Sequence, residues 1–387
     1  MSKPIKEVLI GTMVNGPEVM NELAMAKLSG EDIENQRSEV RRKLREYHPP
    51  FLTLDVLEKE QLDPLAMRIR LCPVDGSVPV FEAGQYINVF VELDGIRTSR
   101  PYSIATAPHQ RAYFDIIVAR KAGGFVSDYL IDALKVGDTL TSTGPMGVFR
   151  YQPVHHKRHQ VMLAGGSGIT PMQSMILDCL AQGCDRELTL FYGARKLEYA
   201  TNHEMFKQLD ERYGNFHYIP VLSDEEQEGY EKGFISKELI KKYVTDVSDA
   251  TFFVCGPEVM NHFCMLELEA LGIRKAMIRR ELFQSRADIE NEPAWPQEIS
   301  PDDTFTITCG KKSFSARATE SVLAALEREG IKVPVGCRSG ECSYCRMKLV
   351  SGKVFTAQGS LLRHADEVFG YIHTCKAYPI SDIEVAL

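Results

Sequence analysis

The sequence of 387 residues predicts a multidomain fold in which an antiparallel β-barrel, a doubly wound α/β domain and a smaller α+β domain follow one another. Three observations predict it. The first part of the chain holds short runs of β-branched and aromatic residues separated by turn residues. The second part holds continuous apolar runs that alternate with helical stretches. The third part opens with a hairpin pattern that leads into an amphipathic helix.

The composition is that of an ordinary globular protein, with 44% hydrophobic and 25% charged residues. The net charge of −8 and the lack of a basic stripe argue against nucleic acid as a partner. No apolar run is long enough to span a bilayer, and the first residues lack the apolar core and cleavage site of a secretory signal. We therefore expect a cytoplasmic protein without a membrane span.

The chain begins with a helical N-terminal extension over residues 1–50, in which we expect a helix from Glu31 to Glu46. Residues 51–152 are expected to form the β-barrel, because short strands recur there at barrel spacing. The runs that predict these strands are FLTLDVLEKE, AMRIRLCPV, QYINVFVEL, TSRPYSIATA, YFDIIVAR and DTLTSTGPM.

Residues 158–283 are expected to form the α/β domain. Its strands are apolar along their whole length, as parallel strands buried on both faces are; they are HQVMLAG, LTLFYGA, FHYIPVLS and ATFFVCG. Residues 284–300 are polar, contain two prolines and are expected to link this domain to the next. Residues 301–387 contain the hairpin, the helix ESVLAALEREG and a cysteine-rich loop.

A glycine-rich loop, LAGGSGITPM at 163–172, follows the first of these strands and opens a helix. Glycines let the backbone approach a pyrophosphate, and a helix N-terminus favours negative charge. The spacing is not G-x-G-x-x-G, and glycine turns into helices are common without a ligand. Cys255 and Gly256 end another buried strand, so both loops could face one crevice. From spacing alone, a buried core thiol is the better interpretation of Cys255.

Two stretches of the β-barrel, RPYSIATAP and KAGGFVSDYL, contain the groups that an anionic aromatic cofactor needs. They offer an arginine for phosphate, a tyrosine for a ring, and a Gly-Gly turn that opens a helix. A strand followed by a turn would contain the same residues, and their chemistry alone does not separate the two interpretations.

The cysteines of the last domain follow the spacing Cys337-x4-Cys342-x2-Cys345, with Cys375 further on, which is the plant-type [2Fe–2S] spacing. Zinc is the main alternative, but structural zinc sites usually draw two Cys-x2-Cys pairs and only one is present here. The scattered cysteines are expected to be buried apolar residues rather than a disulfide framework; they are Cys72, Cys179, Cys184, Cys264 and Cys309.

The order RPYS, GGFVS, GGSGITPM and CGPEVM over residues 52–283 resembles the ferredoxin–NADP reductase superfamily, and residues 303–387 resemble a plant-type ferredoxin of the β-grasp kind. The resemblance implies three cofactors: FAD, a [2Fe–2S] cluster, and NADH or NADPH. The GGFVS and GPMGVF elements are similar to those of the FAD-binding members rather than the FMN-binding ones.

The resemblance also implies roles for individual residues. Arg100 and Pro101 would lie at the flavin phosphates, and Tyr102 would pack on the isoalloxazine. The residues expected to hold the flavin pyrophosphate are Gly124, Val126 and Ser127, and those expected to line the nicotinamide nucleotide site are Gly166, Gly168, Thr170, Pro171, Cys255 and Gly256. Phe283 would lie beside the flavin. The expected catalytic residues are Ser103, near flavin N5, Cys255 and Glu281.

This domain order resembles the reductase components of bacterial oxygenase systems. It implies an NAD(P)H-dependent oxidoreductase that passes electrons through FAD and the [2Fe–2S] cluster to a separate one-electron acceptor protein. Two alternatives remain at this point. One is a stand-alone reductase of a small-molecule acceptor that acts at the flavin, and the other is an iron–sulfur redox sensor.

Several basic residues have two possible interpretations. Arg338, Arg346, Lys348 and Lys376 lie close in sequence to the cluster ligands, where they could meet an acidic partner or form a solvated face. Arg195 and Lys196 follow the second buried strand of the α/β domain, where they could meet a 2′-phosphate or be solvated.

Overall fold

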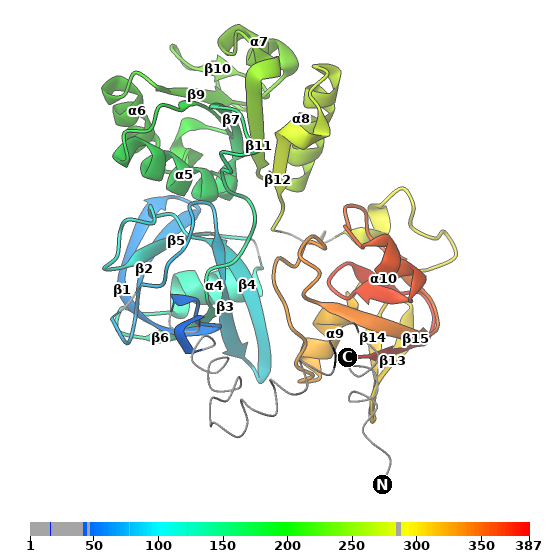
Figure 1. Ribbon diagram of the computed structural model, residues 1–387. Coiled ribbons are helices and arrows are strands. Elements are labelled where there is room, and N and C mark those ends of the chain that lie inside the picture. Colours follow the sequence, from blue (N-terminus) through cyan, green and yellow to red (C-terminus); the bar gives the residue numbers. More distant parts are fainter. Residues whose placement is uncertain (1–15, 17–41, 45–46, 77, 122, 284–287) are drawn as a thin grey trace. The chain divides into compact units, whose positions relative to one another are not determined.

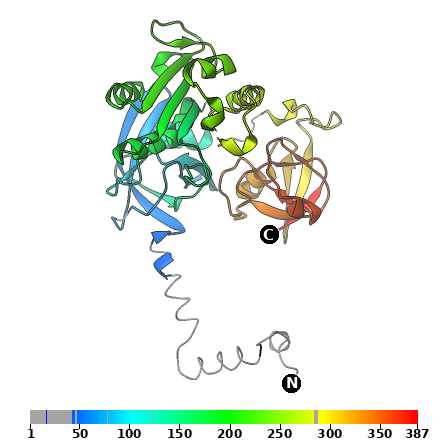
Figure 2. The ribbon, with the colours of Figure 1, turned by 45° about the horizontal axis from the view of Figure 1, so that its top comes forward.

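The computed structural model describes residues 16, 42–44, 47–76, 78–121, 123–283 and 288–387 (Figures 1 and 2). The chain divides into two compact units, Met1–Pro50 and Phe51–Leu387. Most of the helix expected from Glu31 to Glu46, and the start of the expected linker, lie outside the described residues. Among the described residues, no helix is both long and apolar enough to cross a membrane.

The first part of the larger unit is a six-stranded antiparallel sheet in the order β4-β3-β6-β1-β2-β5. Its strands are β1 (Phe51–Asp63), β2 (Ala66–Pro73), β3 (Tyr86–Leu93), β4 (Ile96–Ser103), β5 (Phe114–Ala119) and β6 (Thr139–Thr143). The two edge strands meet where Ile104 bridges Ile116, so the sheet curls into a barrel around its apolar core. Two consecutive helical segments follow β5, α4 (Phe125–Asp128) and η1 (Tyr129–Ala133).

The second part is a six-stranded parallel sheet in the order β10-β9-β8-β7-β11-β12. Its strands are β7 (His159–Gly165), β8 (Glu187–Ala194), β9 (Phe216–Leu222), β10 (Glu231–Lys232), β11 (Ala250–Cys255) and β12 (Ile278–Glu281). The chain builds outward from β7 to one side and then returns to its other side at β11. The sheet therefore has its topological switch point between these two strands.

Helices cover both faces of this sheet (Figure 1). The long helices are α5 (Ile169–Ala181), α6 (His203–Arg212), α7 (Lys237–Tyr243) and α8 (Glu258–Ala270). Helices α5 and α6 share one core with alternate strand residues such as Met162, and α7 and α8 share another with Val161. Shorter turns are η2 (Gly166–Gly168), η3 (Leu197–Tyr199), η4 (Val247–Asp249), η5 (Lys275–Met277) and η6 (Ile289–Asn291). This is the doubly wound arrangement that the sequence predicts.

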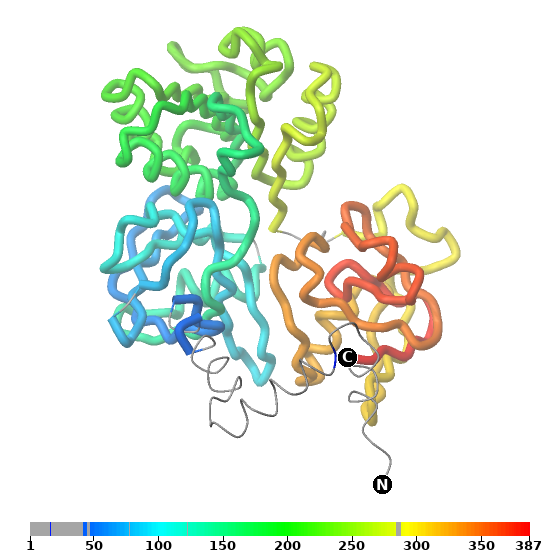
Figure 3. The backbone as a smooth tube through the Cα atoms, viewed as in Figure 1, coloured from blue at the N-terminus to red at the C-terminus, as the bar shows by residue number. Residues whose placement is uncertain are grey.

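The third part is a mixed sheet in the order β14-β13-β19-β15-β17, with a separate pair of β16 and β18. Its elements are β13 (Thr304–Cys309), β14 (Lys312–Arg317), α9 (Val322–Arg328), β15 (Arg346–Ser351), β16 (Val354–Thr356), α10 (His364–Val368), β17 (Tyr371–His373), β18 (Ala377–Pro379) and β19 (Ile383–Ala386). The expected hairpin and helix are present, and the side chain of Ser321 caps α9. Figure 3 traces the long segment between α9 and β15, which contains the cysteine loop.

The expectation for the scattered cysteines was wrong for one pair. Cys179 and Cys184 form a disulfide, with their Cα atoms 5.4 Å apart. Gly183 adopts a φ of 61° just after α5, which turns the chain back so that the Cys184 backbone N–H donates to the carbonyl of Cys179. Cys264 is buried as expected, whereas Cys72 and Cys309 are only half-buried.

The core of the parallel sheet gives a stability prediction. Phe253 on β11 is fully buried, and its ring packs edge-on against Phe149 and His156. Phe253→Ala should lower the free energy of unfolding by about 3–5 kcal/mol, because it removes buried apolar area and leaves a cavity. Urea unfolding followed by circular dichroism measures this change. Phe234→Ala is the control, because that ring is 70% exposed; an equal loss in both variants would contradict the assigned core.

Candidate functional site

Two loops meet at the switch point of the parallel sheet. Residues 166–168 follow β7, residues 256–257 follow β11, and Ala164 pairs directly with Cys255 in the ladder. A methyl group on Gly168 would lie 2.0 Å from the carbonyl oxygen of Cys255, and one on Gly256 would lie 3.2 Å from the backbone of Gly165. The structure thus brings the two predicted loops into direct backbone contact, and glycine is needed for that approach.

The hydroxyl groups around the glycine loop donate hydrogen bonds to the backbone carbonyls of the loop. Thr170 is buried and donates from its Oγ1 atom to the carbonyl of Ser167 over 2.9 Å. Tyr192 on β8 donates to the carbonyl of Gly166 over 3.1 Å. Pro171 is buried in the first turn of α5. Gly166 and Ser167 remain exposed at the start of the helix, where free backbone N–H groups suit an anion.

Cys255 and Glu281 stand side by side at the ends of β11 and β12, where they pair in the ladder. Both side chains are buried, and burial raises the pKa of each well above its ordinary value. The neighbouring carboxyl of Glu341 raises the pKa of Glu281 further. One carboxyl oxygen of Glu281, Oε2, has no hydrogen-bond partner in the described part of the chain. The pair therefore offers a buried thiol and a buried carboxyl group with one unused hydrogen-bonding position.

Tyr86 joins several of the predicted residues, although the sequence analysis did not select it. It pairs with Ser103 across β3 and β4, and its ring meets the ring of Phe283 edge-on at 5.6 Å. A methyl group on Gly336 would lie 3.4 Å from the Tyr86 hydroxyl and 2.7 Å from Sγ of Cys342. Tyr86 therefore lies between the barrel, the end of the parallel sheet and the cysteine loop. In the sequence it is an ordinary strand tyrosine, without a distinguishing signal.

A second residue that the sequence analysis missed is Glu341, inside the cysteine loop. Its carboxyl lies 3.5 Å from the guanidinium of Arg280. Burial raises its pKa to about 7, against the lowering effect of Arg280. The carboxyl groups of Glu281, which is buried, and Glu341, which is half-buried, thus lie close to the cysteines. No motif in the sequence predicts this.

Arg100 is part of a buried polar network on β4. Its Nη1 atom donates to Oγ1 of Thr98 over 2.9 Å and to the carbonyl of Ser99 over 2.7 Å. Thr98 in turn donates to Glu327, which also forms an ion pair with Arg338. Burial lowers the pKa of Arg100, and the charge of Arg338 lowers it further. Arg100 thus reaches Glu327 only through the hydroxyl of Thr98, and a guanidinium of this kind suits a phosphate.

The GGFVS segment forms the predicted turn into a helix. A methyl group on Gly124 would lie 2.1 Å from Oγ of Ser127 and 2.7 Å from the carbonyl of Lys121, so no side chain fits there. The Lys121 backbone N–H donates to Oγ of Ser127 over 3.3 Å. Val126 is buried in the barrel core, and Tyr102 packs against the same core. The turn and Tyr102 therefore pack against the same barrel core.

The four cysteines of the last domain stand as two pairs. The backbone N–H of Cys337 donates to Sγ of Cys342, and Sγ of Cys337 accepts from the backbone N–H groups of Ser339, Glu341 and Cys342 at 3.3–3.4 Å. Hydrogen bonding from Cys342 lowers the pKa of Cys337 to about 5. Likewise, hydrogen bonding with Cys375 lowers the pKa of Cys345 to about 7.

This pairing fits two irons better than one zinc ion. No three metal-binding side chains surround a single point in the described part of the chain, whereas a [2Fe–2S] cluster needs two cysteines for each iron. Gly340, with a φ of 82°, and Arg338 and Ser343, with φ values of 57° and 59°, wrap the loop tightly around the sulfur atoms. Backbone N–H groups directed at sulfur are a feature that tunes such clusters.

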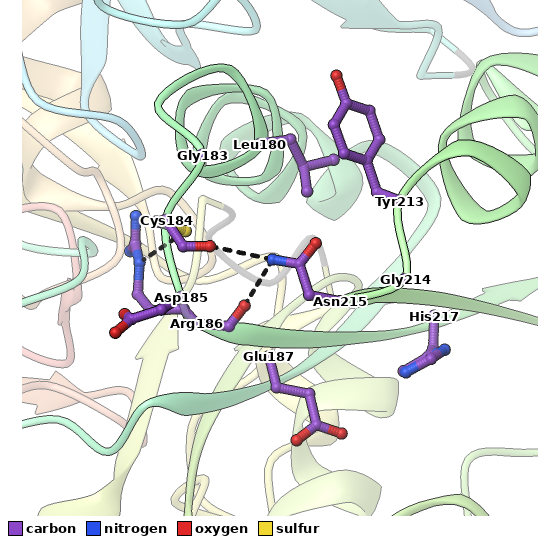
Figure 4. Close-up of a pocket in the computed structure, with 10 residues that line it drawn as sticks. All are labelled: Leu180, Gly183, Cys184, Asp185, Arg186, Glu187, Tyr213, Gly214, Asn215 and His217. Atoms are coloured by element: carbon purple, nitrogen blue, oxygen red, sulfur yellow. Dashed lines mark hydrogen bonds between the residues drawn. The ribbon is translucent and has the colours of Figure 1, made fainter.

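A pocket of about 450 Å³ lies elsewhere (Figure 4). It is lined by residues at the amino ends of β8 and β9, including Glu187 and Asn215, the opposite edge of the sheet from the glycine loops. Asn215 donates to the carbonyls of Cys184 and Arg186 in its wall. The pocket contains none of the predicted site residues.

The two basic residues after β8 already have acidic neighbours. Nε of Arg195 lies 2.7 Å from a carboxylate oxygen of Asp224, and Nζ of Lys196 lies 3.8 Å from one of Glu198. The Arg195 side chain is 81% exposed. These pairs fit the solvated interpretation of the two residues better than a site for a 2′-phosphate.

Comparison with known proteins agrees with this geometry. Family models match over three segments: an oxidoreductase FAD-binding domain over residues 58–151, an oxidoreductase NAD-binding domain over 162–265, and a 2Fe-2S iron-sulfur cluster binding domain over 305–379. FAD, a nicotinamide nucleotide and a [2Fe–2S] cluster are therefore the cofactors of this chain.

Among its relatives, the phenol hydroxylase P5 protein of Acinetobacter pittii is 34% identical over 237 residues, which cover 60% of this chain and 65% of that protein. The glycine betaine monooxygenase reductase subunit of Chromohalobacter salexigens is 27% identical over 321 residues, covering 79% and 87%. The solved structure of phthalate dioxygenase reductase superposes with a TM-score of 0.66 at 25% identity, covering 87% of this chain and 98% of that one.

That structure is described as modular, for electron transfer from pyridine nucleotides to [2Fe–2S]. The three matched segments of this chain coincide with the barrel, the parallel sheet and the domain of the paired cysteines. The chain belongs to the ferredoxin–NADP reductase superfamily, as an oxidoreductase with FAD- and NAD-binding domains and a C-terminal plant-type [2Fe–2S] ferredoxin domain.

Proposed function

We propose that this protein passes electrons from NAD(P)H through FAD and its [2Fe–2S] cluster to a separate protein acceptor, such as an oxygenase. The observation that supports this most is the position of Tyr86. It contacts Phe283 at the end of the nucleotide domain, pairs with Ser103 on the barrel, and lies beside the cysteine loop. A hydride donor and a one-electron carrier at one junction need a mediator, and bound FAD supplies that conversion.

In this proposal the barrel holds FAD through two groups of residues. Arg100 and Pro101 lie at the phosphates, with Tyr102 against the ring system and Ser103 at its reactive edge. Gly124, Val126 and Ser127 shape the turn for the pyrophosphate, since only glycine fits before that helix. The guanidinium of Arg100 would balance the phosphate charge.

The nicotinamide nucleotide would lie across the switch point, as ligands of open α/β sheets do. Gly166, Gly168, Thr170 and Pro171 would receive its phosphates at the start of α5, and Cys255 and Gly256 would face its ring. Burial raises the pKa of Glu281 well above its ordinary value, and its Oε2 atom has no hydrogen-bond partner in the described part of the chain. It can donate or accept one hydrogen bond at the reacting edge, which positions the partners for hydride transfer.

The relatives support a protein acceptor, because one is named a monooxygenase reductase subunit and another a phenol hydroxylase component. We propose an acceptor of that class, and a cytoplasmic location where the nicotinamide is available.

The cluster ligands give the first functional prediction. Cys342→Ser should lower the rate of NADH-dependent cytochrome c reduction by about 100-fold, because one iron loses a ligand. Ferricyanide reduction, which takes place at the flavin, should remain within about twofold of the wild-type rate. Steady-state assays with cytochrome c and with ferricyanide measure the two rates.

Cys309→Ser is the matched control for this experiment, because Cys309 is a half-buried cysteine of the same domain outside the four ligands. It should leave both rates unchanged. If Cys342→Ser lowered both rates equally, the assigned order of carriers would be wrong. If it lowered neither, a small-molecule reductase acting at the flavin would be the better description.

The contact of the two loops gives the second functional prediction. Gly168→Ala should reduce kcat/KM for NADH at least about tenfold, since the new methyl group forces the loops apart. Gly214→Ala, where a methyl group meets nothing within 4 Å, should leave kcat/KM unchanged. Steady-state kinetics with ferricyanide measure both variants. Unchanged kcat/KM in Gly168→Ala would show that the nicotinamide does not lie at this contact.

A further inference from the structure

Helix α9 of the ferredoxin domain packs against strand β4 of the barrel. Strand β4 comes first in the order of the barrel sheet and pairs with β3. It contains Arg100 and Ser103, which are both expected to lie at the flavin. The contacts between α9 and β4 therefore connect the domain of the cluster to the strand that is expected to bind the flavin.

Glu327 on α9 makes the central contact. Its Oε2 atom accepts a hydrogen bond from Oγ1 of Thr98 over 2.9 Å and one from Nη1 of Arg338 over 3.1 Å. Its Oε1 atom accepts from Nη2 of Arg338. Only 11% of the Glu327 side chain and 10% of the Arg338 side chain are exposed. One enclosed carboxylate thus binds the barrel through a hydroxyl group and the cysteine loop through a guanidinium group.

Arg338 makes a second contact with the barrel. It directly follows Cys337 in the sequence, and its Nη2 atom donates to Oγ of Ser99 over 3.3 Å. Ser99 is fully buried on β4. Arg338 is therefore not part of a solvated face, which was one of its two interpretations from the sequence. It ties the first cluster ligand to the same strand that Glu327 contacts.

The charge of Glu327 is what favours this arrangement. Arg100 donates from Nη1 to Oγ1 of Thr98, so a second guanidinium lies on the barrel side of the contact. The pKa of Arg100 is lowered first by burial and then by the positive charge of Arg338. Without the carboxylate, Arg338 would be enclosed without its counter-charge, and separation of the domains would let water reach it.

We propose that Glu327 is a positioning residue that holds the cysteine loop against the barrel for electron transfer from the flavin to the cluster. It acts through Arg338 and Thr98. In the step concerned, one electron leaves the reduced flavin and one enters the oxidised cluster. The effect on the rate of this step rests on the proposed function, whereas the docking of the two domains rests on the contacts of Glu327 alone.

The test is anaerobic stopped-flow mixing of the holoprotein with NADH or NADPH, whichever reduces the flavin faster, with flavin and cluster absorbances followed together. Glu327→Gln keeps the shape of the side chain and removes its charge. We expect cluster reduction to slow at least about tenfold, because only a fraction of the molecules is docked at any time. Reduction of the flavin by the nucleotide should stay within about twofold of the wild-type rate.

Glu329→Gln is the matched control. Glu329 lies at the end of the same helix and also pairs with an arginine, but that partner is Arg328 of the same domain. The substitution should leave both rates unchanged.

A second pair of variants tests the contact from the barrel side. Thr98→Val removes the hydroxyl that donates to Glu327 and leaves the ferredoxin domain as it is. It should slow cluster reduction at least about fivefold in protein with full FAD content, since a hydrogen bond to a charged group is lost. Thr98→Ser keeps the hydroxyl and should restore the wild-type rate.

Two measurements separate positioning from other causes of a slow rate. Hydrogen exchange over β4 and α9, measured without reductant, should be faster in Glu327→Gln and unchanged in Glu329→Gln. Titration with dithionite should give the wild-type reduction equilibrium of the cluster. A shifted equilibrium would explain a slower rate by a changed driving force and would overturn the proposal.

An unchanged rate of cluster reduction, or unchanged hydrogen exchange, in Glu327→Gln with full cluster content would also overturn it. If Glu327→Gln assembles no cluster, Thr98→Val takes its place, and the same two outcomes in that variant would overturn the proposal. If the wild-type cluster accepts no electrons from either nucleotide, the proposed function fails, while hydrogen exchange still tests the docking. Full-rate cluster reduction in the wild type and in Glu327→Gln would remove this inference alone.

Discussion

Tyr86 makes the contact on which the proposed chemistry depends. Its ring packs against Phe283, its backbone pairs with Ser103, and its hydroxyl lies next to the loop that holds Cys342. Biological electron transfer needs close packing between carriers, and this contact brings the ends of three domains to one place. Gly336 lies where the cysteine loop approaches Tyr86. A Cβ atom at this position would lie 2.7 Å from Sγ of Cys342, which is too close for a side chain.

Buried charge is arranged around the same junction. Burial raises the pKa values of the carboxyl groups of Glu281 and Glu341, which lie close to the cysteine loop. Positive charge meets negative charge in one ion pair there, Arg338 with Glu327. A site that exchanges electrons changes its charge, and fixed opposite charges reduce the cost of that change.

Sequence-based prediction worked best where all residues of a motif lie within one short segment. The cysteine spacing from Cys337 to Cys345 and the apolar strand ATFFVCG predicted their local structures correctly, because ligand spacing and two-sided burial are properties of adjacent residues. The contacts of Tyr86, the carboxyl of Glu341 and the disulfide of Cys179 were not predicted. Each depends on where the folded chain places a residue that looks ordinary in sequence, and the roles of the individual cofactor-binding residues stay predictions.

The central claim is that nicotinamide electrons reach the cluster through the flavin. An anaerobic titration of the holoprotein with NADH, and separately with NADPH, tests it most directly when the flavin and iron–sulfur absorbances are followed together. We predict that one of the two nucleotides bleaches the flavin band and also the cluster band. Bleaching of the flavin band alone, with a cluster that dithionite can still reduce, would contradict the proposed path.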